Sequence, residues 1–300
     1  MQASFKVLLT GARGQLGRCL QDIFPKQWDI LAVDMADLDI TEAAAINACV
    51  SGFKPDAIIN AAAYTAVDKA QSESDLCYAV NVTGVRNLSC AAKKHNAKFI
   101  HISTDYVFDG NSAIPYAEDM QTDPQCVYGK TKLEGEIACM DANPASIIIR
   151  TAWVFSEYGH NFVKTMLNLG KTRDDISIVS DQIGCPTYAG DIAAAIIKLL
   201  QVQESENPPQ GIYHFCGDQI VSWYEFAQAI FELARLTGDY PHTPHCHKIA
   251  TLQYPTPAKR PAYSGLDCTK ISKYKIEPSN WHRALTLILP ILAKPCSENE

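Results

Sequence analysis

The sequence predicts an α/β fold: a doubly wound parallel sheet followed by a smaller C-terminal lobe. Up to Arg150, short apolar runs alternate with stretches typical of helices, which indicates crossover connections and a sheet covered on both faces. The first apolar run, FKVLLT, is continuous and ends at a glycine, as expected of a buried parallel strand. After Arg150 this alternation breaks down, so we expect a second, smaller unit there.

Five apolar runs are the expected strands of the sheet: Phe5–Thr10, Asp29–Asp34, Ala57–Asn60, Lys98–Ser103 and Ser146–Arg150. The expected helices between them are Gly14–Phe24, Thr41–Ser51 with Thr41 as its cap, Leu76–His95, and one that contains Tyr128–Met140. Beyond them we expect helices at Asn161–Gly170, Gly190–Leu200, Ser222–Thr237 and Trp281–Ala293, with a short strand at Ile176–Val179. Ser222 and Glu225 have the spacing of a capping box. The segment Pro241–Pro261 is expected to be an ordered surface loop.

Composition excludes several classes of function. The 300 residues carry a net charge of −7, which argues against a nucleic-acid partner, because such a protein needs a basic surface. No apolar run approaches the roughly 20 residues of a membrane helix, and Met1–Lys6 is too short and polar to serve as a signal peptide. The 11 cysteines include no CxxC pair. We therefore expect a cytoplasmic protein with reduced thiols and no membrane partner.

Glycines at positions 11, 14 and 17 follow the first strand directly and open the first helix. Such a turn needs residues that tolerate positive φ, such as Gly11, and that lack a Cβ where a pyrophosphate approaches. The free N–H groups at the start of the helix can bind that phosphate. The position of the loop predicts a dinucleotide-binding Rossmann domain at residues 1–152, to which residues 176–200 return, and a substrate-binding domain at 153–300.

The identity of the coenzyme stays open between NADPH and NADH. Asp34 ends the second strand, where a carboxylate accepts hydrogen bonds from ribose hydroxyls and repels a 2′-phosphate. Arg13 and Arg18 favour the opposite choice, because either guanidinium can pair with that phosphate. Asp39 and Ile40 lie in the stretch where an adenine could be bracketed.

Tyr128 and Lys132 are the candidate proton-transfer pair. Their i, i+4 spacing places both side chains on one face of the predicted helix. An ammonium beside a phenol lowers the pKa of the phenol, which suits a group that passes a proton to a forming alkoxide. Thr104 follows the fourth strand, and its hydroxyl can stabilise a developing oxyanion, with Ser103 as the second choice.

These three elements, in this order, resemble the extended short-chain dehydrogenase/reductases. Further stretches resemble, within that family, the dTDP-4-dehydrorhamnose reductases, and the resemblance covers nearly the whole chain. They are NAAAYTAVD at 60–68, STDYVF at 103–108, VYGKTK at 127–132, RTAW at 150–153, DQIGCPT at 181–187 and YPTPAKRP at 254–261.

The resemblance implies an NAD(P)H-dependent oxidoreductase that reduces the C4 ketone of dTDP-6-deoxy-L-lyxo-4-hexulose to dTDP-L-rhamnose. It assigns catalysis to Thr104, Tyr128 and Lys132. Its other assignments are the pyrophosphate contacts Gly14, Gln15 and Leu16, the coenzyme-lining residues Ala63, Tyr64 and Thr65, and the substrate contacts Asp105 and Trp153. Arg260 could pair with the substrate diphosphate or be a solvated loop residue.

Two alternatives remain beside the reductase. The first is a non-catalytic subunit of the same fold, as in the regulatory subunit of methionine adenosyltransferase, although Tyr128 and Lys132 are intact here. The second is an epimerase or dehydratase of nucleotide sugars, which Tyr106 weakens because a dehydratase usually carries a carboxylate at that position. A homodimer is one option for the assembly. We assign no metal: the cluster His242, His245, Cys246 and His247 matches no closed zinc pattern.

Overall fold

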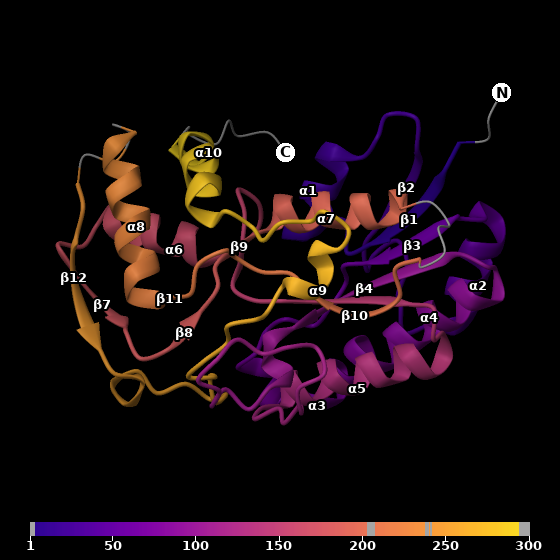
Figure 1. Ribbon diagram of the computed structural model, residues 1–300, viewed down its shortest axis with the longest axis horizontal. Helices are drawn as coiled ribbons and strands as arrows, with labels where there is room; N and C mark the ends of the chain where they lie inside the picture. The colour runs from indigo at the N-terminus through magenta and orange to yellow at the C-terminus, as the bar shows by residue number, and fades with distance from the viewer. Residues whose placement is uncertain (1–3, 203–207, 238–239, 241, 294–300) are drawn as a thin grey trace.

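The computed structural model describes residues 4–202, 208–237, 240 and 242–293. Its centre is a six-stranded parallel sheet with the strand order β10-β5-β4-β3-β1-β2 (Figure 1). The strands are β1 (Lys6–Thr10), β2 (Asp29–Val33), β3 (Ala57–Asn60), β4 (Lys98–Thr104), β5 (Ile147–Thr151) and β10 (Gly211–His214). All five predicted strands are confirmed, each to within one residue at either end. The sixth strand, β10, was not predicted, because its four residues GIYH contain only a short apolar run.

Helices cover both faces of this sheet, which confirms the doubly wound fold. One face carries α1 (Gln15–Ile23) and α7 (Ala189–Gln201), and the other carries α2 (Ala43–Phe53), α4 (Val85–Lys94) and α5 (Val127–Ala142) (Figure 1). Successive residues of β1 enter different cores: Val7 and Leu9 pack on the α1 side, whereas Leu8 packs on the α2 side. Burial of both faces explains why the strand is apolar throughout.

Two helix predictions need correction. The stretch predicted as one helix from Leu76 is divided into α3 (Ser74–Tyr78), a π-helical turn at Ala79–Gly84, and α4. The start of α2 was predicted at Thr41, but the helix begins at Ala43. The Thr41 hydroxyl instead donates to the Asp39 carboxylate at 2.8 Å, and this local bond competes with capping.

A smaller C-terminal lobe lies beside the sheet and has its own core. It contains α6 (Phe162–Gly170), α8 (Trp223–Leu236) and α10 (Trp281–Ala293), together with β7 (Asp175–Val179) paired in parallel with β12 (His245–Ile249) (Figure 1). The capping box of α8 is confirmed. The prediction of a loop from Pro241 onward was wrong at β12, where polar histidines mask the strand pattern; Pro241 itself lies outside the described residues.

Short paired strands connect the two parts of the molecule. β6 (Val154–Phe155) pairs with β9 (Thr187–Tyr188), β8 (Ile183–Gly184) pairs with β11 (Val221–Ser222), and α9 (Thr269–Ser272) follows later in the chain. Within 176–200, α7 packs against α1 of the central layer, while β7 belongs to the small sheet. The proposed division after residue 152 stays a prediction.

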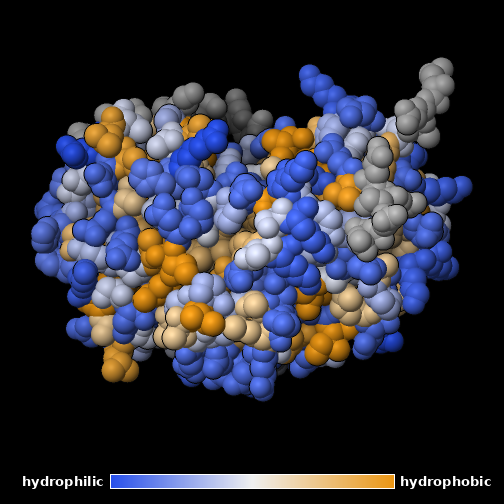
Figure 2. Space-filling model, in the orientation of Figure 1, coloured by the Kyte–Doolittle hydropathy of each residue, from blue (hydrophilic) through white to orange (hydrophobic). Residues whose placement is uncertain are grey.

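The face shown in Figure 2 is largely hydrophilic, and its hydrophobic residues form separate patches rather than a continuous belt. Within the part of the chain that the structure describes, no helix is both long enough and apolar enough to cross a membrane.

Candidate active site at the carboxyl edge of the sheet

The glycine loop lies between β1 and α1, as predicted, and its backbone requires glycine. Gly11 has a φ of 72°, and a Cβ there would lie 2.6 Å from the Ala62 nitrogen. A Cβ on Gly17 would lie 2.2 Å from the Gly11 carbonyl oxygen. The loop therefore brings the β1 and β3 ends together with the first turn of α1. This is the point at which the strand order reverses, where open α/β sheets bind their ligands.

Asp34 lies at the exit of β2, next to the loop. Its carboxylate accepts hydrogen bonds from the backbone N–H groups of Arg13 at 2.9 Å and Met35 at 2.9 Å. The Arg13 guanidinium is exposed and lies 4.0 Å from the Asp37 carboxylate. Ile40, expected near an adenine, is buried, and its side chain packs against Gly84.

Gln15 connects the start of α1 to the C-terminal lobe. Its side-chain oxygen accepts hydrogen bonds from Asn161 at 2.9 Å and from Ser156 at 3.1 Å, while the adjacent Leu16 is buried. Sequence reasoning missed this contact because the partners lie far apart in the chain.

Ala63, Tyr64 and Thr65 follow β3 and line the same edge of the sheet. The Tyr64 backbone N–H donates to Asn81 in the π-helical turn at 2.9 Å, and its phenol donates to Glu73 at 2.6 Å. The hydrogen bond to Glu73 raises the pKa of Tyr64 to about 12. Turns of this kind often occur at functional sites, and here the turn fixes the exit of β3.

Thr104, Asp105 and Tyr128 meet where β4 ends. The Thr104 hydroxyl donates to Asp105 Oδ1 at 2.9 Å and is hydrogen-bonded to Tyr128. The second carboxylate oxygen of Asp105, Oδ2, is buried without a partner. Burial raises the pKa of Asp105 to about 6. These three side chains form the most chemically distinctive part of the edge.

Burial also raises the pKa of Tyr128, and the bond with Thr104 only partly offsets this effect. This direction is opposite to the one expected from the neighbouring ammonium. The reason is that Tyr128 is 9% exposed and Lys132 is 2% exposed, so desolvation of the phenolate dominates. The phenol is therefore held in its protonated form.

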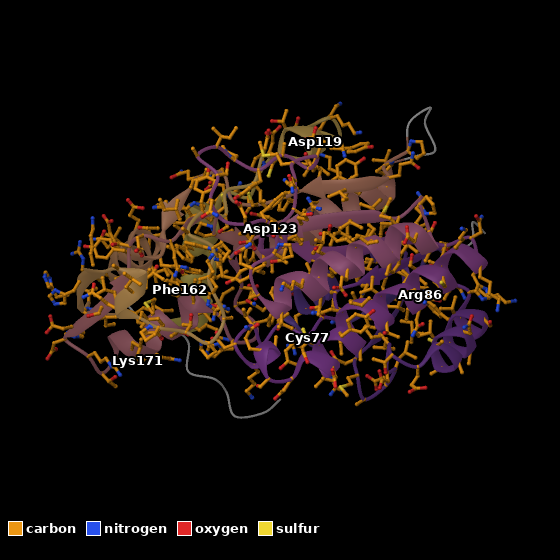
Figure 3. The ribbon with its side chains drawn as sticks, turned by 90° about the horizontal axis from the view of Figure 1, so that it is seen from below. Cys77, Arg86, Asp119, Asp123, Phe162 and Lys171 are labelled. Carbon is orange, nitrogen blue, oxygen red and sulfur yellow. The ribbon has the colours of Figure 1, made fainter. Side chains whose placement is uncertain are left out.

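Lys132 lies one turn after Tyr128 on α5 and is fully enclosed. Its ammonium donates to the Ile102 carbonyl at 2.6 Å and lies 3.3 Å from His101 Nε2. Burial lowers the pKa of Lys132 to about 8. Cys77, labelled in Figure 3, lies on α3 beside this helix, and its thiol is 3.2 Å from the Thr131 hydroxyl.

A buried ion pair supports the next turn of α5. Arg150 and Glu136 make two hydrogen bonds, Nε to Oε1 at 2.9 Å and Nη2 to Oε2 at 2.7 Å. The Ser103 hydroxyl donates to the same carboxylate at 2.5 Å. Ser103, the second choice for the catalytic hydroxyl, is thus engaged by Glu136, whereas Thr104 contacts Tyr128.

Trp153 lies with its ring against Trp223 at the start of α8 and close to Gly184 on β8. Its ring stacks on Trp223 with centroids 3.4 Å apart and an angle of 6°, and its φ is 46°. A Cβ on Gly184 would lie 2.5 Å from the Trp153 ring. Phe162, which Figure 3 labels in the C-terminal lobe, packs against Trp223 with centroids 4.6 Å apart. Trp223 was missed from sequence, because nothing in its neighbourhood indicated a partner.

Arg260 is paired, and its side chain is 23% exposed. Its guanidinium donates to the Asp68 carboxylate at 2.6 Å and to the Tyr106 hydroxyl at 3.1 Å. Tyr106 in turn meets the Tyr128 ring edge to face, with centroids 5.4 Å apart. The proline-rich loop is thereby fixed to the carboxyl edge of the sheet.

The histidine cluster lies away from this edge. His247 pairs with Asp175 at 2.7 Å, and His242 lies 3.3 Å from Asp174. Across the described ranges, the structure brings together no group of three or more metal-binding side chains.

Comparison with known proteins gives consistent results. The family described as the RmlD substrate binding domain matches residues 5–293. A dTDP-4-dehydrorhamnose reductase of Aggregatibacter actinomycetemcomitans is 49% identical over 284 residues, which cover 93% of this chain and 97% of the relative. The solved dTDP-4-dehydrorhamnose reductase of Clostridium acetobutylicum is 40% identical with a TM-score of 0.88, and the match covers 96% and 100% of the two chains. The solved enzyme of Bacillus anthracis, in complex with NADP, is 36% identical with a TM-score of 0.90, over 96% of this chain and 100% of that one.

Proposed function

The chain belongs to the RmlD substrate binding domain family, and on that premise we propose that it reduces the C4 ketone of dTDP-6-deoxy-L-lyxo-4-hexulose to form dTDP-L-rhamnose. Family membership confirms the predicted resemblance and the predicted class, an NAD(P)-dependent oxidoreductase. The substrate, the product and the roles of individual residues are our proposal.

The observation that carries the proposal is that Thr104 and Tyr128 lie together at the edge that also holds the glycine loop. Lys132 lies one turn further along α5 and is bonded to the Ile102 carbonyl of β4. The residues at this edge suit a dinucleotide, because Gly11 and Gly17 let the loop pack closely against the ends of β1 and β3. Helix α1 then begins without a side-chain hydrogen bond at its N-cap, Gly14, so that its first N–H groups can bind a pyrophosphate. The residues that would hold it are Gly11, Arg13, Gly14, Gln15, Leu16, Asp34, Asp39, Ile40, Ala63, Tyr64, Thr65, Tyr128 and Lys132. A bound NADPH or NADH supplies the hydride.

Tyr128 is the proposed proton donor. Reduction of a ketone adds a hydride to carbon and a proton to oxygen, so the donor must carry its proton when substrate binds. Burial keeps the Tyr128 phenol protonated. The Thr104 hydroxyl lies beside that phenol and donates its one proton to Asp105; with substrate bound, it would donate to the ketone oxygen in place of Asp105. The Lys132 ammonium stabilises the phenolate that remains after the proton has moved.

Asp105, Trp153 and Arg260 are the proposed substrate contacts. The buried, unpartnered Oδ2 of Asp105 is an acceptor that a sugar hydroxyl can satisfy. Trp223 covers one face of the Trp153 ring and holds it in place. We assign the remainder of this ring to contact with a sugar or base of the substrate. Arg260 can exchange its bond to Asp68 for a phosphate oxygen.

The test is reduction of freshly made dTDP-4-keto sugar, followed as loss of reduced-nicotinamide absorbance with NADPH and with NADH. Tyr128→Phe should lower turnover by about 10²–10⁴-fold and change coenzyme affinity by a few-fold at most. Tyr213→Phe is the matched control, because Tyr213 is also buried but bonds to Tyr274, away from the edge. Turnover retained in Tyr128→Phe would remove Tyr128 from the mechanism.

The same assay separates the alternatives. A non-catalytic subunit would bind coenzyme without oxidising it. An epimerase or dehydratase would convert the sugar without net consumption of reduced coenzyme.

A further inference from the structure

A buried chain of polar side chains lies behind Lys132, and the proposed mechanism does not use it. Asn60 ends β3, His101 lies on β4, and both are 0% exposed. Asn60 Nδ2 is 3.1 Å from His101 Nδ1, and His101 Nε2 is 3.3 Å from Lys132 Nζ. Buried polar groups of this kind have well-defined donors and acceptors, so the direction of each bond can be worked out.

The direction is set by the backbone at Ala62. Its N–H can only donate, and it lies 3.1 Å from Asn60 Oδ1. The Thr10 hydroxyl donates to the same oxygen at 2.8 Å. The amide of Asn60 therefore presents its NH₂ group to His101, and Nδ1 of the imidazole must be the acceptor. Burial lowers the pKa of His101 well below its usual range, so the ring is neutral and its one proton is on Nε2.

The Nε2–H of His101 consequently points at Lys132. An ammonium has three donors and no lone pair, so it cannot accept this bond. An uncharged amine can accept it and can still donate to the Ile102 carbonyl at 2.6 Å. The contact is thus favourable for the amine and unfavourable for the ammonium.

Other groups also face Lys132. Cys77 on α3 faces it from the neighbouring element, and Tyr128, Glu136 and Cys139 lie on its own helix. The Glu136 carboxylate favours the ammonium, but both of its oxygens are already bound to Arg150. Burial lowers the pKa of Lys132 to about 8, in the same direction as the contact with His101.

We propose that Asn60 and His101 are positioning residues whose fixed hydrogen-bond direction stabilises the amine form of Lys132, and so sets the upper limit of the pH range in which the enzyme works. The inference rests on the proposed function, in which the ammonium is the active form. Neither residue contacts the reacting atoms.

The first experiment reverses the direction of the chain with Asn60→Asp. A carboxylate accepts from Ala62 N–H and also from His101 Nδ1–H, so the imidazole proton moves to Nδ1 and the lone pair of Nε2 faces the ammonium. The high-pH limb of the kcat/KM profile should then move upward by about one pH unit. Since the new charge alone also favours an ammonium, Asn60→Asp is repeated in a His101→Phe background. In that background, the shift of the high-pH limb caused by Asn60→Asp should be less than about a third of the shift that the same substitution causes when His101 is present.

The second experiment measures the tautomer of His101 directly, with ¹⁵N-labelled histidine and long-range proton–nitrogen NMR. His101→Phe identifies the resonances by their loss. The wild-type ring should carry its proton on Nε2, and Asn60→Asp should carry it on Nδ1. This measurement needs no turnover, so it remains decisive if the proposed substrate is wrong or if Asn60→Asp does not fold. Any of three results would overturn the inference. They are a proton on Nδ1 of His101 in the wild type, an unchanged high-pH limb in Asn60→Asp, and an equal shift of that limb when Asn60→Asp is combined with His101→Phe.

Discussion

Removal of the Arg150 guanidinium tests the structural role of the charges beneath the candidate site. In Arg150→Met the Glu136 carboxylate stays buried, with both residues at 2% exposure in the wild type. It loses hydrogen bonds of 2.9 Å and 2.7 Å and keeps only the Ser103 hydroxyl. Two charge-assisted bonds at roughly 1.5–3 kcal/mol each give a loss of about 3–6 kcal/mol, a range that includes the roughly 3–5 kcal/mol typical of breaking a buried ion pair.

The assay is urea unfolding followed by circular dichroism, without coenzyme or substrate. Arg13→Met is the matched control, because the Arg13–Asp37 pair spans 4.0 Å with side chains 73% and 50% exposed, and such pairs contribute about 0–1 kcal/mol. Arg150→Met combined with Glu136→Leu should recover much of the loss, since no unpaired charge remains. An unfolding free energy for Arg150→Met within about 1 kcal/mol of the wild type, or strictly additive losses in the double variant, would refute the reasoning.

Three further outcomes are expected. Gly184→Ala should raise the KM for the sugar and leave coenzyme affinity unchanged, because the new Cβ would lie 2.5 Å from the Trp153 ring; an unchanged KM would contradict the placement of that ring. Asp105→Asn should abolish efficient turnover yet stabilise the fold. Burial raises the Asp105 pKa from 3.8 to about 6, so the wild-type fold loses stability as pH rises between these values. The stability that Asp105→Asn gains over the wild type should be about 3 kcal/mol at pH 7.5 and should vanish near pH 3.5 in thermal unfolding scans. Turnover of the wild type should be constant between the Asp105 pKa of about 6 and the Lys132 pKa of about 8, and should fall above the latter because the ammonium is lost there; a profile flat from there to pH 10 would show that Lys132 stays charged.

The sequence was most informative where a local pattern has one physical meaning. The strands of the sheet were found because burial on both faces demands continuous apolar runs, as in β1 and β3. The capping box of α8 was found because its two residues bond to each other. The glycine loop was found because Gly11 and Gly17 have no room for a side chain.

Contacts between distant segments could not be predicted in this way. Arg260 pairs with Asp68 across 192 residues of chain, and nothing local to either residue indicates the other. The stack of Trp153 on Trp223 and the bond from Asn161 to Gln15 are of the same kind. The expected direction of the Tyr128 pKa was wrong because the sequence showed the neighbouring charge but not the depth of burial.

Helix α5 carries Tyr128, Lys132 and Glu136 at intervals of four residues. Each further residue in an α-helix turns the following side chains by about 100°. A single-residue insertion after Tyr128 would therefore rotate Lys132 and Glu136 away from the helix face that they share with Tyr128. It would separate Lys132 from β4 and Glu136 from Arg150 at the same time. Point substitutions can spare two of the three side chains, but a change in length cannot. We expect relatives to differ in composition along this helix and in the lengths of the loops around it, while the number of residues from the phenol to the carboxylate stays constant.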